Sequence, residues 1–177
     1  MKDFDYNIAR IISKLKREKK KETIIKFFKK QGMTIGEGCN ICSNITTPES
    51  HLVVLGENVT IAGNVEFVTH DNSISKVLPE FTDLFGKIII GDNCFIGARS
   101  IIMYGVTLAN NIIVASGSVV TKSFEEERII IAGNPAKKIS TWDLFAEKNR
   151  CYGWNLNSVS RSEQIQMQKD GVKLINR

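Results

Sequence analysis

The sequence predicts an all-β solenoid, a parallel β-helix in which short strands stack along one axis. Three observations carry this prediction. A six-residue repeat runs without a slip through residues 90–124, turn-forming residues recur at fixed places in it, and the region lacks the i, i+3, i+4 apolar spacing of a helix. Each repeat buries one large aliphatic side chain, so stacked repeats share a continuous core.

An aliphatic residue anchors each repeat. Of the ten repeats that begin with one, seven have Gly or Ala next, and nine have a small or β-branched residue three positions after that. Asn or Gly commonly precedes that residue, which suits a tight corner because both tolerate left-handed backbone. The anchoring residues are Ile35, Ile41, Leu55, Ile61, Ile90, Ile96, Ile102, Leu108, Val114 and Val120.

The repeat is interrupted twice. Residues 47–54 (TPESHLVV) shift the register by two, and residues 73–87 form a longer insertion that contains Pro79, Phe81 and Phe85. The aromatic content predicts an ordered protruding loop, and interruptions of a solenoid are commonly functional loops. A simple surface insertion is the alternative for residues 73–87.

The two ends fall outside the repeat, which gives three predicted segments. Residues 1–33 form an N-terminal helical segment that caps the solenoid, residues 34–139 form the β-helix, and residues 140–177 form a C-terminal helix and polar tail. The helical predictions rest on apolar residues at helical spacing. These are Phe4, Ile8, Ile11 and Leu15 at the N-terminus and Trp142, Leu144 and Phe145 after the repeat.

Positive charge is concentrated at the N-terminus. Residues 1–30 carry a net charge of +7 and the remainder carries −2, so the β domain is not a basic nucleic-acid surface. The basic end is interpreted as a solvated helix face, with peripheral contact to anionic lipid headgroups as the alternative. Without an apolar run of membrane-spanning length or a secretory signal, the sequence predicts a cytoplasmic protein.

The cysteines are explained by the repeat. Cys39-x-x-Cys42 invites a zinc or redox interpretation, but no second CxxC motif completes a four-ligand zinc site. Cys39 and Cys94 both occupy the small inward position of their repeats, where such a thiol acts as a small hydrophobe. We therefore expect no bound metal.

One of the two histidines lies where the repeat breaks. His70 stands in FVTHDN (67–72), directly before the insertion and on a corner, where a side chain points outward into a cleft. A neutral imidazole there can take the proton of an attacking hydroxyl. Its other nitrogen needs an orienting acceptor, for which adjacent Asp71 is the first candidate. The alternatives are a backbone carbonyl, Asn40, Asn44, Glu66 and Asp83.

The repeat pattern over about residues 34–139 resembles that of the hexapeptide-repeat acyltransferase superfamily. The segment NVEFVTHDNS, followed by IGDNCFIGARS and AGNPAK, resembles the galactoside, maltose and polysaccharide O-acetyltransferases of that superfamily. The resemblance implies a left-handed β-helix and a homotrimer with active sites between subunits. It also implies transfer of an acetyl group from acetyl-CoA to a sugar or polysaccharide hydroxyl, without a metal.

The same resemblance implies roles for individual residues. His70 is the expected general base, with Asp71 beside it, and Asn44 lies near the position of an acceptor-site asparagine. The protruding loop, with Phe81 and Phe85, is expected to wall the acceptor site of a neighbouring subunit. Residues at CoA-contacting positions are Phe95, Ala98, Ser116, Thr121, Lys122 and Lys137, the lysines as phosphate partners. Ser140 stands where the family often has Arg or Lys, which puts one phosphate contact in doubt.

Three other functions fit part of the pattern. An amino-sugar N-acetyltransferase would use the same base and cosubstrate. A β-helix carbonic anhydrase needs three zinc-binding histidines, whereas this chain has two, His51 and His70, which are not spaced for one site. A non-catalytic scaffold would leave His70 without a role.

Overall fold

The computed structural model describes residues 19–45, 47–171 and 173–175. The chain forms two compact units, Met1–Ile139 and Ser140–Arg177, and each is described by itself. The helical spacing of Phe4, Ile8, Ile11 and Leu15 lies outside the described residues.

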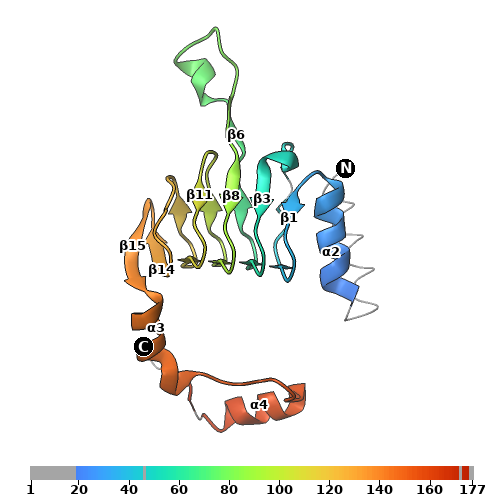
Figure 1. Cartoon of the computed structure of the whole chain (residues 1–177), viewed down its shortest axis with the longest axis vertical. Coiled ribbons are helices and arrows are strands. Elements are labelled where there is room, and N and C mark those ends of the chain that lie inside the picture. The colour runs from blue at the N-terminus through green and yellow to red at the C-terminus, as the bar shows by residue number, and fades with distance from the viewer. Residues whose placement is uncertain (1–18, 46, 172, 176–177) are drawn as a thin grey trace. The chain divides into compact units, whose positions relative to one another are not determined.

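The first unit is a parallel β-helix. Successive strands along the chain join different sheets, so the chain winds around three sheets that share one core (Figure 1). One sheet holds β1 (Thr34–Ile35), β3 (Val53–Leu55), β8 (Ile88–Ile90) and β11 (Thr107–Leu108). The second holds β2 (Asn40–Ile41), β4 (Thr60–Ile61), β9 (Phe95–Ile96), β12 (Ile113–Val114), β14 (Ile129–Gly133) and β15 (Ala136–Thr141), and the third holds β5 (Glu66–Phe67), β10 (Ile101–Ile102) and β13 (Val119–Val120).

Strand pairing confirms the period and its first interruption. Ile101 pairs with Val119, eighteen residues later, so three six-residue repeats make one coil. Thr34 instead pairs with Val54, twenty residues later. The two extra residues fall at 47–54, where a 3₁₀ turn, η1 (Ser50–Leu52), interrupts the repeat. Glu49, directly before this turn, contacts His70 at a corner of the following coil.

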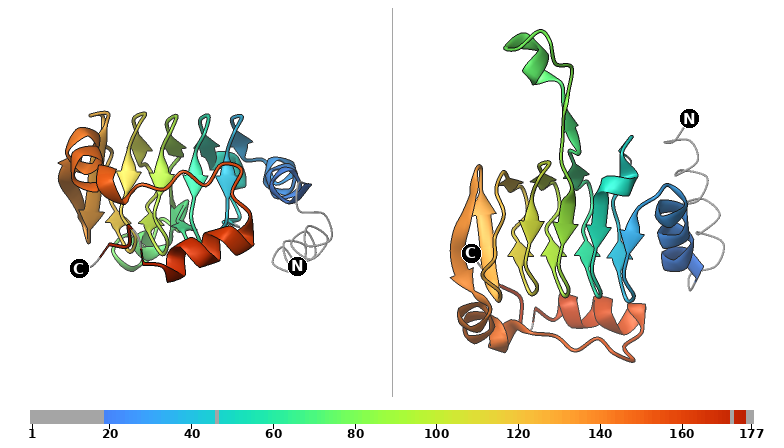
Figure 2. Two further views of the ribbon diagram at one scale, coloured as in Figure 1. Left: turned by 90° about the horizontal axis from the view of Figure 1, so that it is seen from below. Right: turned by 45° about the horizontal axis from the view of Figure 1, so that its top comes forward.

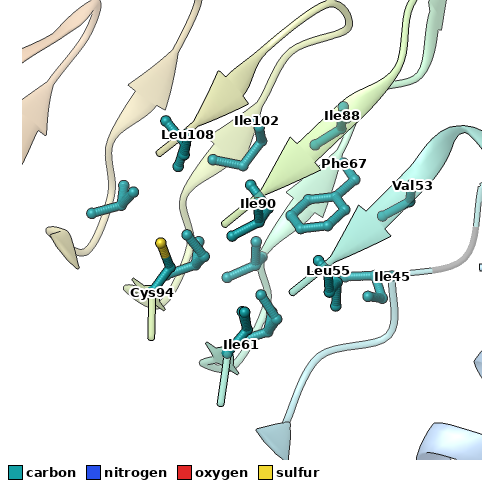
Figure 3. Packing of buried hydrophobic residues seen from close by; sticks show 14 of the residues in the cluster. Ile45, Val53, Leu55, Ile61, Phe67, Ile88, Ile90, Cys94, Ile102 and Leu108 are labelled. Carbon is teal, nitrogen blue, oxygen red and sulfur yellow. The ribbon is translucent and has the colours of Figure 1, made fainter. Parts of the chain in front are cut away.

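The core is a stack of aliphatic side chains. All ten anchoring residues of the repeats are buried, and Figure 3 shows Leu55, Ile90 and Leu108 among their neighbours. Cys39 and Cys94 are buried in the same cluster, as the register predicted. Burial raises the pKa of the Cys94 thiol to about 11, which keeps it protonated and unreactive at neutral pH.

The corners contain the residues that left-handed backbone requires. Asn58, Asn93 and Asn111 have φ between 54° and 60°. They occupy the same corner position in three successive coils. Gly97 is needed for a different reason. A Cβ atom built on it would lie 2.4 Å from the backbone nitrogen of Ser116 in the next coil, so only glycine permits this approach of the two coils.

Helix α2 (Lys19–Lys30) packs on the first coil. Its Ile24 and Phe28 are buried in the same cluster as Met33 and the repeat residues. The helix contacts β1 and β2, and Figure 1 shows it beside β1 at the start of the solenoid. The exposed positions of α2 carry Glu22 and several lysines, and its apolar side packs against the core of the β-helix.

The second interruption forms an arm that leaves the solenoid. Strands β6 (His70–Asp71) and β7 (Leu84–Phe85) pair antiparallel at its base, and η2 (Ser73–Lys76) lies beyond them. Figure 1 and the right-hand view of Figure 2 show the arm projecting from the stacked coils. The arm predicted at 73–87 is therefore ordered, and it begins at His70.

The second unit is helical. The predicted C-terminal helix is α3 (Trp142–Asn149), which is followed by η3 (Arg150–Tyr152). The residues expected to form a polar tail contain a further helix, α4 (Arg161–Lys169), whose start is fixed by a reciprocal capping box of Ser160 and Glu163. Within the described ranges, every helix is too short or too polar to cross a bilayer.

Candidate active site

A cleft of about 270 Å³ opens beside the base of the arm. His70 lies at its edge, and Asn44 and Glu66 line it as well. The structure thus brings the predicted base and the predicted acceptor-site asparagine to one cleft, although they lie on different coils. The remaining lining residues are Ile45, Thr47, Pro48, Phe67, Val68 and Thr69.

The imidazole of His70 is oriented by Glu49. Its Nδ1 lies 2.9 Å from Oε2 of Glu49, and the two side chains are 39% and 19% exposed. An ionised carboxylate only accepts hydrogen bonds, so Nδ1 carries the hydrogen and Nε2 is left with a free lone pair. A general base requires such a lone pair, and the His70 side chain is partly exposed.

This geometry corrects the expectation that Asp71 orients the histidine. Oδ1 of Asp71 accepts a hydrogen bond from the backbone N–H of Ser73 at 2.8 Å, and Oδ2 accepts one from the hydroxyl of Tyr104 at 3.5 Å. The bond from Ser73 is the main cause of the lowered pKa of Asp71. Asp71 therefore fixes the start of the arm against the coil that carries Tyr104, because side chains at neighbouring strand positions diverge.

Two buried threonines complete the surroundings of Glu49. The hydroxyl of Thr69 donates to Oε2 of Glu49 at 2.7 Å, and the hydroxyls of Thr47 and Thr69 lie 2.5 Å apart. Partial burial by itself raises the pKa of Glu49. The hydrogen bonds from Thr69 and then His70 outweigh this effect, and the net pKa is lowered. Glu49 is therefore ionised at neutral pH.

The other candidates for the orienting role lie elsewhere. The amide of Asn40 donates to the Cys42 sulfur at 3.7 Å, and Asp83 lies on the arm. Asn44 and Glu66 line the cleft, where they can meet a substrate. Among the described residues, no group of three or more His, Cys, Asp or Glu side chains is arranged to hold a metal ion.

The arm places one of its two predicted aromatic residues at the histidine. Phe85 pairs with His70 across β6 and β7, and the ring centroids are 5.9 Å apart at a tilt of 37°. The Phe85 side chain is nevertheless exposed. Phe81 lies further along the arm in a turn closed by its backbone N–H to Leu78, and it is exposed too.

Two residues at predicted CoA positions stack on one corner of the solenoid. The carbonyl of Ala98 accepts a hydrogen bond from the N–H of Gly117, directly after Ser116. Ala98 and Ser116 occupy equivalent places in adjacent coils, as the pairing of Phe95 with Ile113 requires.

The remaining predicted CoA positions are spread along the solenoid. Thr121 and Lys122 follow β13, at the same corner of the coil that His70 occupies in an earlier coil. Nζ of Lys122 lies 5.7 Å from the centroid of the Phe124 ring. Phe95 is exposed on β9, and Lys137 is exposed on β15. All are accessible, but the single chain does not gather them around His70.

A separate hollow of about 420 Å³ lies within the second unit. Trp154, Met167, Asp170 and Lys173 line it together with Asn155. Trp154 Nε1 donates to the carbonyl of Lys173, so two residues that line the hollow are hydrogen-bonded to each other. Its lining residues include no histidine.

Sequence reasoning missed Glu49. It weighed five side chains as partners of His70 but left out the carboxylate inside the first interruption, residues 47–54. The available signal was the principle already applied to the second interruption, that breaks in a solenoid carry function. The first interruption adds two residues and lies about one coil before His70. Its side chains therefore reach the corner at which His70 lies.

Known proteins resemble the chain over this β-helix. The profile of the family described as "Hexapeptide repeat of succinyl-transferase" matches residues 87–122. Protein CapG of Staphylococcus aureus is 39% identical over 126 residues, which cover 68% of this chain and 72% of CapG. Galactoside O-acetyltransferase of Escherichia coli K12 is 32% identical over 97 residues, or 54% of this chain and 47% of that protein, about half its length.

Solved structures share the fold. A maltose O-acetyltransferase from Clostridium difficile 630 aligns with a TM-score of 0.57 at 22% identity, covering 79% of this chain and 87% of that one. A galactoside acetyltransferase in complex with coenzyme A aligns at 0.58 and 22%, covering 85% and 87%. This likeness and the hexapeptide profile imply left-handed winding. Together with the match to CapG, they show that the chain belongs to the hexapeptide-repeat acyltransferase superfamily.

Proposed function

We propose that the protein transfers an acetyl group from acetyl-CoA to a hydroxyl of a sugar or polysaccharide, with His70 as the general base. The observation that carries the proposal is the pair formed by His70 and Glu49 at the edge of a cleft that Asn44 also lines. The similar proteins include galactoside and maltose O-acetyltransferases, which supports the reaction class.

The chemistry needs one proton acceptor with a fixed tautomer. Nε2 of His70 takes the proton of the acceptor hydroxyl while that oxygen forms a bond to the thioester carbonyl carbon. The carbon–sulfur bond then breaks, and the imidazolium returns the proton to the departing thiolate. Glu49 holds Nδ1–H throughout and stabilises the positive charge that His70 carries between the two transfers. A base placed in this way contributes about 10²–10⁴-fold to the rate.

The acetyl-CoA side of the site is assigned to residues along the solenoid. The stacked corner of Ala98 and Ser116 suits the thin pantetheine arm, because Gly97 lets the two coils approach closely. Lys122 and Lys137 are exposed cations that suit the phosphates of CoA. Phe95 and Thr121 complete the set as apolar and hydroxyl contacts.

We further propose that the active unit is a homotrimer with a site at each subunit interface. The arm supports this proposal, because its apolar side chains are exposed in the single chain. Phe81 and Phe85 would then contribute to an acceptor pocket shared with a neighbour. Because acetyl-CoA is held inside the cell, the predicted cytoplasmic location remains part of the proposal. The exposed apolar residues of the arm are Val77, Leu78, Phe81, Leu84 and Phe85.

Turnover by the purified protein tests the function. Acetyl-CoA is incubated with a panel of galactosides, glucosides, amino sugars and capsular oligosaccharides, and acetylated products are measured by chromatography and mass spectrometry. Detection of free CoA with thiol-reactive dyes is avoided, because the exposed Cys42 and Cys151 would react with them as well. We expect an O-acetylated sugar, and a loss of at least about 10²-fold in His70→Ala but not in His51→Ala.

The product identity decides between the related reactions. An N-acetylated amino sugar would replace the O-acetyl proposal by the N-acetyl alternative. Equal turnover in His70→Ala and the wild-type protein would remove His70 from the mechanism.

A further inference from the structure

We propose that Thr69 and Thr47 are positioning residues, forming a directed chain of hydroxyl donors that holds the Glu49 carboxylate against His70. The inference rests on the proposed function, because it concerns how the base is kept in its working geometry. Neither threonine is expected to touch a substrate. The three contacts that carry it are Thr47 to Thr69, Thr69 to Glu49, and His70 to Glu49.

The two threonines are almost fully buried in the wall of the cleft. Thr69 is 1% exposed and Thr47 is 4% exposed, whereas the side chain of His70 is 39% exposed. Thr69 and His70 are consecutive in the chain, yet both side chains reach the same oxygen, Oε2 of Glu49. One carboxylate oxygen is thus bound by a buried hydroxyl and by a partly exposed imidazole at once.

The single hydrogen of each hydroxyl fixes the direction of the chain. Ionised Glu49 has no hydrogen to give, so Thr69 donates to it and its one hydrogen is used. Thr69 can therefore only accept in its contact with Thr47, and Thr47 must be the donor there. The order is Thr47 to Thr69 to Glu49, and His70 donates to the same oxygen of Glu49. The Thr47 hydroxyl also lies 3.5 Å from that oxygen, a longer contact than its 2.5 Å approach to Thr69. Each donor polarises the next, which strengthens a chain of this kind.

The chain matters because a glutamate is flexible. The Glu49 side chain has three rotatable bonds and is partly exposed, so a bond to His70 alone leaves it free to turn toward water. Thr69 is rigid, since it is β-branched and buried. Its hydroxyl at 2.7 Å fixes Oε2 at the point that Nδ1 of His70 also reaches.

The directed chain predicts a graded response to removal of each hydroxyl. Thr69→Val keeps the side-chain shape but removes the buried hydroxyl that donates to Glu49 at 2.7 Å. Thr47→Val leaves the bond from Thr69 to Glu49 intact and removes the donor to Thr69, together with the longer 3.5 Å contact of the Thr47 hydroxyl with Glu49. Thr69→Ser keeps the hydroxyl and is the conservative variant. We expect kcat/KM to fall about tenfold in Thr69→Val and about threefold in Thr47→Val, and to recover in Thr69→Ser.

The histidine tautomer gives a readout that general destabilisation does not move. The chain has two histidines, so ¹⁵N-histidine NMR spectra of the His51→Gln background report His70 alone. We expect the hydrogen on Nδ1 in the wild-type background and in Thr69→Ser, and a mixture of tautomers in Thr69→Val. Ser100→Ala, which removes a buried hydroxyl bound to a backbone carbonyl, is the matched control and should change neither tautomer nor turnover.

The outcomes separate this inference from the proposed function. Thr69→Val with wild-type turnover and a pure Nδ1–H tautomer overturns the inference, even if acetyl transfer is established. The tautomer measurement needs no substrate. A mixed tautomer in Thr69→Val therefore supports the inference even if the wild-type protein acetylates none of the sugars tested.

Discussion

Oε2 of Glu49 lies 2.9 Å from Nδ1 of His70, although 21 residues separate them in the chain. Asp71, the immediate neighbour of His70, bonds instead to Ser73 and Tyr104. The division of labour follows from strand geometry, because the Asp71 side chain points away from that of His70. The first interruption of the repeat supplies the partner of the base, and the residue after the base anchors the arm.

Replacing Glu49 separates its charge from its hydrogen-bonding role. Glu49→Gln keeps an oxygen that can accept from Nδ1–H but loses the charge, whereas Glu49→Ala loses both. We expect kcat/KM to fall by about 10- to 100-fold in Glu49→Ala, the effect of losing a charge-assisted hydrogen bond worth roughly 1.5–3 kcal/mol. Glu49→Gln should fall less. Steady-state kinetics with the best acceptor found would measure both.

Asp71 offers the matched control for this comparison. Asp71→Asn keeps the bond from Ser73, so it should change kcat much less than Glu49→Ala. A larger kcat defect in Asp71→Asn than in Glu49→Ala would return the orienting role to Asp71.

The ionised Glu49 also makes stability depend on pH. The pKa of Glu49 lies below its ordinary value of 4.5 in the folded protein, so the unfolded chain binds more protons in this range. Its contribution is therefore fully present above the unfolded pKa and is lost as the pH falls through the folded pKa. Urea unfolding between pH 7 and pH 3.5 should show this loss in the wild-type protein. The acid-side slope should be shallower in Glu49→Gln, and an identical slope in both would contradict it.

The solenoid could be predicted from sequence because its period is local. Each repeat buries its own aliphatic residue and turns its own corner, so the pattern survives without knowledge of distant contacts. Asn58, Asn93 and Asn111 have the positive φ that their corner positions predicted. Helix α4 was missed although its S-x-x-E capping box, Ser160 to Glu163, was readable, because its apolar positions are sparse.

The site could be predicted only where it depended on one position. His70 stood out because the repeat breaks directly after it. The contact of His70 with Glu49 depends on the register between adjacent coils, which the two-residue shift at 47–54 changes. The approach of Phe85 likewise depends on how the arm closes on itself. Such pairings are set by three-dimensional stacking, which spacing along the chain does not specify.

The ring of Phe85 should affect the acceptor more than the chemical step. It lies 5.9 Å from the His70 ring and remains exposed, so it is available to an acceptor sugar. In Phe85→Ala we expect KM for the acceptor to rise about tenfold, with KM for acetyl-CoA nearly unchanged. Leu84→Ala, at the adjacent exposed position, is the control. A fall in kcat alone would instead assign Phe85 to the positioning of His70.

Two glycines of the solenoid should respond oppositely to alanine. A Cβ on Gly97 would meet the Ser116 nitrogen at 2.4 Å, and the backbone there cannot yield without moving a coil. Gly97→Ala should therefore destabilise the fold by about 1–3 kcal/mol. Gly63, at a nearby corner, has open space around its Cβ position, and Gly63→Ala should be neutral or stabilising by up to about 1 kcal/mol. Urea unfolding of both variants would reveal the contrast.

Lys122 and Lys137 should affect acetyl-CoA and not the acceptor. Both lysines are exposed: Lys122 follows β13 and Lys137 lies on β15. A lysine contributes to phosphate binding as a point charge. We expect Lys122→Ala and Lys137→Ala each to raise KM for acetyl-CoA by about three- to tenfold at low salt, and the difference from wild type to shrink as salt is added. Lys21→Ala on α2 is the control for a general change in surface charge. An equal rise in acceptor KM, or an effect that salt leaves unchanged, would exclude a phosphate contact for that lysine.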